Sequence, residues 1–74
     1  MPLLNLTKKV ADSFGLAHKI NLEVLRHYIK TTSEEKLIEE IKEIKDASYF
    51  RFLWEAGLSA GLQQVVLQQL KIIK

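Results

Sequence analysis

Apolar residues recur along the chain at spacings of three and four positions, which is the period of one face of an α-helix. Glycines and residues that commonly cap helices interrupt this pattern at short intervals. No segment keeps the strict alternation of apolar and polar residues that is typical of a half-buried strand. The sequence therefore predicts an all-α protein with five short helices.

The first two helices are expected on either side of a glycine. The first is predicted from Leu4 or Leu6 to Phe14, with Gly15 ending it in the left-handed conformation. The second is predicted to begin with Asn21 as its N-cap, because the apolar residues around that position have the spacing of a hydrophobic staple. The segment between Gly15 and Asn21 is then a turn.

The third helix has the clearest start. Thr32 is predicted to be its N-cap, because Glu35 follows three residues later in the capping-box pattern. The carboxylates over residues 34–43 alternate with lysines, so we expect them to form a solvated helix face.

The last two helices are bounded by caps and a glycine. Asp46 is predicted to cap a helix that runs to Ala56, with Gly57 as its C-terminal stop. Ser59 is predicted to cap a fifth helix that runs to the end of the chain.

These elements predict a single domain over residues 1–74, folded as a compact orthogonal bundle of four or five short helices. A chain of this length buries roughly 60% of the surface that its unfolded form exposes, so the core must be small. The predicted core consists of the apolar residues on the inner stripes: Leu6, Val10, Phe14, Leu25, Ile29, Leu37, Ile41, Ile44, Phe50, Leu53, Trp54, Leu62, Val66 and Leu70.

The composition is typical of a globular chain, with 47% hydrophobic residues and no cysteine. The start of the sequence lacks the features of a signal peptide, and no apolar run approaches the ~18 residues of a membrane span. We therefore predict a cytoplasmic protein without a membrane partner.

Charge is small in total but unevenly placed. The net charge is +2, yet bases dominate up to Thr31 and acids dominate from Thr32 to Ala56. Such polarity can steer partners or favour head-to-tail contacts, although salt screens both effects.

Catalytic and metal-binding patterns are weak. His18 and His27 lie in different predicted elements, without the spacing of metal ligands, and the three glycines form no phosphate-binding loop. His18 is expected in a loop and His27 on a helix surface. The sequence thus predicts no enzyme, no metal and no cofactor.

Nucleic-acid binding is one alternative, through a helix-turn-helix-like segment at residues 7–30. A small residue, Ala11, precedes Gly15 by four positions, and the following helix is basic. The expected turn from Gly15 to Ile20 is longer than this motif normally has, which counts against the alternative. The candidate phosphate or base contacts are Lys19, Arg26, His27 and Lys30.

Protein–protein interaction or self-assembly is the leading prediction, with a homo-oligomer as the expected form. Tyr49 and Phe52 lie on a second apolar stripe of the aromatic fourth helix, while Leu67 and Ile72 do not fit the inner stripe of the fifth. These four residues are either additional core or a partner surface.

The last two predicted helices resemble a HEAT-like helical hairpin. An Asp opens the first helix, a tight turn precedes the second, and the basic residue often found in that second helix is replaced by Gln63 or Gln64. The resemblance implies stacked antiparallel helix pairs that bind protein, without catalytic residues. The residues that carry it are Ile44, Lys45, Asp46, Phe50, Leu53, Trp54, Leu58, Leu62, Val65, Val66 and Leu70.

Overall fold

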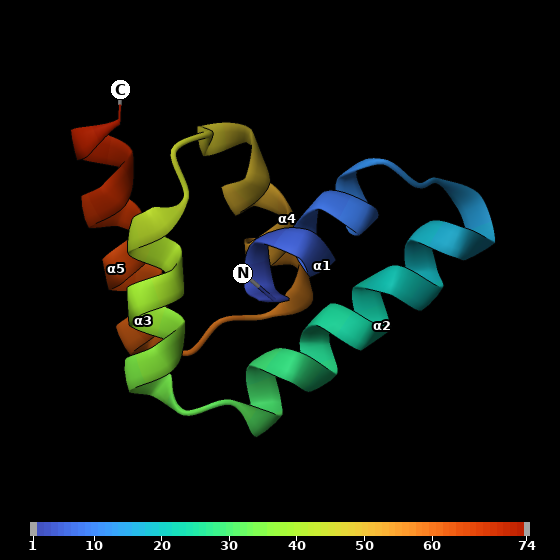
Figure 1. Ribbon diagram of the computed structural model, residues 1–74, viewed down its shortest axis with the longest axis horizontal. Helices are drawn as coiled ribbons and strands as arrows, with labels where there is room; N and C mark the ends of the chain where they lie inside the picture. The colour runs from blue at the N-terminus through green and yellow to red at the C-terminus, as the bar shows by residue number, and fades with distance from the viewer. Residues whose placement is uncertain (1, 74) are drawn as a thin grey trace.

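The computed structural model describes residues 2–73, in which helices joined by short connections make up the fold, without a strand (Figure 1). This confirms an all-α bundle of four or five short helices. The last helix was predicted to run to the end of the chain, but it ends at Ile72 with Ile73 as its C-cap, and Lys74 lies outside the described residues. The elements are α1 (Pro2–Ala11), α2 (Gly15–Thr31), α3 (Glu34–Glu43), the 3-10 turn η1 (Ala47–Tyr49), α4 (Phe50–Ala56) and α5 (Ala60–Ile72).

Helix α1 lies at the centre of the molecule and packs against α2, α3 and α4 (Figure 1). Helices α3 and α5 lie side by side at one end, and α2 runs obliquely past α1 and α4. The turn between α1 and α2 lies at the opposite end, far from α3 and α5. The buried core consists of Leu3, Val10, Leu25, Ile29, Leu37, Ile41, Ile44, Phe50, Leu53, Ala56, Leu62 and Val66.

The capping residues fix the helix starts in the second half of the chain. The Ser59 hydroxyl accepts the backbone N–H of Leu62 at 3.3 Å, which confirms Ser59 as the N-cap of α5. At α3 the prediction of Thr32 was wrong by one residue. The cap is Ser33, whose hydroxyl accepts the N–H of Lys36 at 3.3 Å, because Thr32 is the C-cap residue that follows α2.

The start of the fourth helix is less simple than predicted. Asp46 accepts the N–H of Ser48 at 3.0 Å and so caps η1, and α4 follows from Phe50 without a side-chain cap of its own. Gly57 ends α4 with a φ of 104°, a conformation that favours glycine, as predicted.

The first half of the chain departs most from the sequence prediction. Helix α1 ends at Ala11 rather than Phe14, and α2 begins at Gly15, six residues before the predicted cap Asn21. Gly15 does have a positive φ of 64°, but it opens α2 instead of closing α1. Asn21 lies within the helix, where its side chain donates to the Ser13 hydroxyl at 3.1 Å and so fastens α2 to the turn.

Two residues predicted for the core are exposed. Phe14 is 88% exposed, because it occupies the extended turn position before α2 instead of the end of α1. Trp54 is 42% exposed because it lines an open hollow between α4 and α5. Leu6 and Leu70, also predicted as core, are partly buried and pack against it.

Polar side chains are buried where helices meet. Glu40 of α3 is buried and accepts hydrogen bonds from the Tyr28 hydroxyl of α2 at 2.9 and 3.1 Å, so the prediction of a fully solvated acidic face was wrong at this position. Gln69 of α5 is also buried and donates to the carbonyl oxygens of Lys42 and Ile44 at 3.0 and 3.2 Å. These bonds join α2 to α3 and α5 to α3 while satisfying the buried polar atoms.

Candidate interaction surfaces

The outward face of α2 carries a row of exposed apolar side chains. Leu16 is 74% exposed, Ile20 is 56% exposed and Val24 is 48% exposed. They follow one another at intervals of four residues, so they form a continuous ridge along the helix. We call these three residues the α2 ridge. Phe14 lies just before its first residue, at the exposed end of the molecule.

The opposite side of the same helix forms part of the core. Leu25 and Ile29 are buried there, and Leu22 packs against the core. Helix α2 is thus apolar on two sides, and the elements of its own chain cover only one of them. Sequence reasoning missed the ridge because it assigned the residues between Gly15 and Asn21 to a turn. The spacing of four from Leu16 to Val24 was the available signal.

Charged side chains flank the α2 ridge on one side. Lys19 and Glu23 are exposed there, four positions apart. Glu23 also forms an ion pair with Arg26, which in turn donates from Nε to the backbone carbonyl of Ala56 at 2.9 Å. Arg26 therefore ties α2 to the C-terminal end of α4.

The predicted nucleic-acid contacts are only partly available. Lys19, His27 and Lys30 are exposed on α2, as predicted for His27, whereas Arg26 is partly buried in the contacts just described. The predicted long turn was wrong. The connection between α1 and α2 covers only residues 12–14, because α2 starts at Gly15.

The sequence predicted His18 in a loop, but this residue lies in α2 and connects it to two other helices. Its Nδ1 is 3.1 Å from the carbonyl oxygen of Val10, and its Nε2 is 3.4 Å from a carboxylate oxygen of Glu55. The ring also contacts Phe52 edge-on, at 6.2 Å between centroids. These contacts join α1, α2 and α4 at one point.

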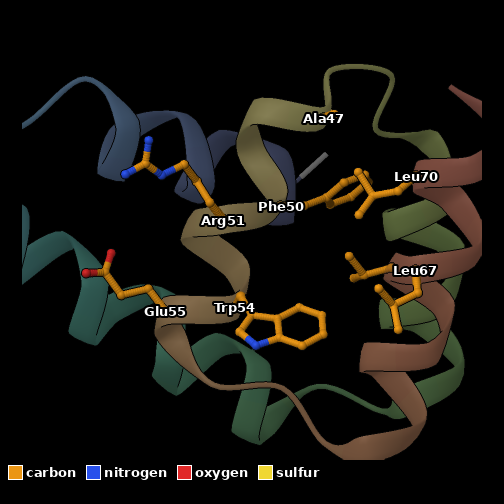
Figure 2. A pocket seen from close by; sticks show the side chains of 8 residues that line it. Ala47, Phe50, Arg51, Trp54, Glu55, Leu67 and Leu70 are labelled. Carbon is orange, nitrogen blue, oxygen red and sulfur yellow. The ribbon is translucent and has the colours of Figure 1, made fainter. Parts of the chain in front are cut away.

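A shallow apolar groove lies between α4 and α5 (Figure 2). Phe50 and Trp54 of α4 point towards Leu67 and Leu70 of α5, around a volume of about 670 Å³. Charged residues of α4 lie at its margin, and Figure 2 shows that Arg51 points away from the groove. We call this feature the α4–α5 groove.

The four predicted interface residues do not form one surface. Tyr49 and Phe52 are partly buried and pack against the core. Leu67 is 44% exposed and lines the α4–α5 groove. Ile72 is 75% exposed and lines a separate depression between α3 and α5, near Ile38.

Two titratable groups have shifted pKa values, and both shifts have structural causes. Partial burial, reinforced by the hydrogen bond to the Glu40 carboxylate, raises the pKa of Tyr28. Hydrogen bonds from the side chain and backbone of Ser48 lower the pKa of the exposed Asp46. Across residues 2–73, histidines and acidic residues form no group of three or more that could hold a metal ion.

A comparison of the chain with protein-family models, with curated proteins and with solved structures found no match in any of the three. None of the helices in the described part of the chain has the length and apolar character needed to cross a membrane. The class of protein is therefore defined by the fold and its surfaces: a small helical bundle with an apolar ridge on α2 and an apolar groove between α4 and α5.

Proposed function

We propose that this protein is a protein-interaction module that self-associates and has no catalytic activity. The observation that carries the proposal is the apolar surface of α2, where the three ridge residues form a continuous exposed row and Phe14, just before them in the chain, is also exposed. Contiguous exposed apolar surface of this kind is typical of protein–protein interaction sites. The α4–α5 groove offers a second surface of the same character.

Two of the candidate polar residues, His18 and Glu40, have structural partners. His18 joins three helices, and Glu40 is satisfied by Tyr28. We assign these groups to stability rather than to a reaction. The HEAT-like resemblance implies the same class of partner, namely protein, and a cytoplasmic location remains a prediction from the sequence.

Light scattering across protein concentration tests the proposal. We expect the molar mass to rise from that of one chain towards that of two as the concentration increases from about 1 µM to several hundred µM, the range of weak, specific association. A mass that stays at one chain over the whole range would contradict self-association.

DNA binding is a second candidate, which one observation favours. The three-residue connection between α1 and α2 has the length that helix-turn-helix motifs use. The length of the turn therefore no longer counts against DNA binding. Exposed cations on α2 are few, however, and Glu23 lies among them. Specific DNA binding commonly uses about six to ten phosphate contacts. A gel shift with duplex DNA that is lost in Lys30→Ala and in high salt would support this alternative over ours.

A further inference from the structure

The shape of the α2 ridge suits packing against a second helix. Its side chains are four residues apart, or about 6 Å along the helix axis. Ridges of this spacing pack into the grooves between the corresponding side chains of a facing helix. Two copies of the ridge can therefore interleave when one is shifted by half of this spacing relative to the other.

The charged flank of the ridge determines which direction a second copy would take. Lys19 and Glu23 lie on one side of the ridge, and the other side carries the uncharged Ala17 and Asn21. In an antiparallel pair with a two-fold axis, the same flank of each copy faces its counterpart in reverse order. An axis level with Asn21 brings Lys19 of each copy opposite Glu23 of the other.

The same axis also gives the required offset of the ridges. With the axis level with residue 21, Ile20 of one copy lies between Ile20 and Val24 of the second copy along the helix direction. The apolar contact and the two ion pairs are thus satisfied by one register. In a parallel pair the charged flank would face the uncharged one, and His27 would face His27 of the second copy.

The exposed apolar area is enough for a weak but specific pair. At their observed exposures, Phe14 and the three ridge residues present roughly 500 Å² per chain, so a two-fold pair would bury roughly 1,000 Å² from these residues. This is at the lower limit of specific interfaces, which corresponds to transient association.

We infer that a second copy of this chain covers the α2 ridge, and that the two α2 helices pack antiparallel with reciprocal ion pairs between Lys19 and Glu23. The inference rests on the proposed self-association and specifies its surface and register. It makes the α2 ridge, not the α4–α5 groove, the contact between copies.

The first test substitutes one ridge residue. We expect Ile20→Glu to remain folded, by circular dichroism, and to lose dimerisation at every concentration at which the natural sequence is dimeric, because two carboxylates would be buried in the apolar contact. Ile72→Glu is the matched control, since Ile72 is at least as exposed but lies on α5. We expect it to leave the molar mass unchanged.

The second test uses charge reversal and does not touch the apolar ridge. Lys19→Glu gives an all-acidic flank and Glu23→Lys an all-basic one, so each alone should dimerise about tenfold more weakly at low salt, because both pairs become repulsive. Mixing the two variants restores both pairs between chains. We expect the mixture to form a one-to-one dimer as tightly as the natural sequence. Glu23→Lys also removes the ion pair with Arg26 within the chain, but mixing does not change this loss, so restored dimerisation reports only on the pairs between chains.

The outcomes separate the register, the surface and the proposed function. A monomeric natural sequence would overturn both proposals. A dimer that Ile20→Glu leaves intact, and that Leu67→Glu in the groove disrupts, would overturn the α2 surface while self-association stands. A dimer that Ile20→Glu disrupts but that mixing of the charge variants does not restore would overturn the antiparallel register.

Discussion

The two apolar faces of α2 are built from the same kinds of residue at the same helical spacing, yet they have different environments. On the inner face, Leu25 and Ile29 are covered by the other helices of the chain. On the outer face, Ile20 and Val24 remain exposed. The comparison teaches that helical period shows which residues share a face, but does not show whether the chain has another element to cover that face.

The largest expected effect separates two adjacent residues of the two faces. Leu25→Ala should lower the free energy of unfolding by about 2 to 5 kcal/mol, because it removes a fully buried side chain and leaves a cavity. Val24→Ala, on the ridge, should change it by less than about 0.5 kcal/mol in dilute solution, where the chain is monomeric. Urea unfolding measures both, and equal losses would break the distinction between the faces.

An intermediate effect is expected at the edge between the two faces. Tyr28→Phe should destabilise the fold by about 1 to 3 kcal/mol, because it leaves the buried Glu40 without its donor. Thr31→Val is the control on α2, since the Thr31 hydroxyl bonds only within its own helix. Thermal unfolding with an unchanged midpoint for Tyr28→Phe would show that the inner face is held by apolar contacts alone.

The raised pKa of Tyr28 adds a pH dependence to the same variant. A folded pKa above the ordinary value of 10.0 means that the stability this group contributes is complete below about pH 10 and is lost as the pH rises through the folded pKa. The natural sequence should therefore lose stability more steeply than Tyr28→Phe above pH 10. Identical pH profiles would contradict the assigned role of the hydroxyl.

The smallest effect concerns the junction where α2 ends and α3 begins. Ser33→Ala should cost about 1 kcal/mol, because it removes the N-cap of α3, whereas Thr32→Ala should cost less. Melting of the two variants side by side gives the comparison. A larger loss of stability for Thr32→Ala than for Ser33→Ala would show that Thr32 is the N-cap, as the capping-box pattern predicts.

The second half of the fold could be predicted from the sequence because its boundaries depend on local chemistry. Ser59 offers a hydroxyl to the first turn of α5, and Gly57 adopts a backbone conformation that other residues rarely take. Both signals act within a few residues of their position. The sequence pattern therefore located the start of α5 correctly, and Leu62 and Val66 of its stripe are buried as expected, whereas Val65 and Leu70 are only partly buried.

The first half could not be predicted as well, because its signals have two readings. Gly15 does take a positive φ, but this value does not reveal whether a helix ends or begins there. Asn21 has the side chain of an N-cap, yet a tertiary hydrogen bond to Ser13 uses it inside α2. The resulting error placed Phe14 in the core and concealed the ridge, so most of the candidate interaction surface became visible only in the structure.

A distance between the two copies tests the central claim most directly. The chain has no cysteine, so Thr31→Cys gives one spin-label site, exposed near the C-terminal end of α2. In the antiparallel pair each label is ten residues from the two-fold axis, which predicts about 30 Å between them along the helix direction. Pulsed electron paramagnetic resonance of the dimer should show this distance, and Ile20→Glu should abolish it. A distance below about 15 Å, or no dipolar coupling in samples that light scattering shows to be dimeric, would contradict antiparallel pairing through α2.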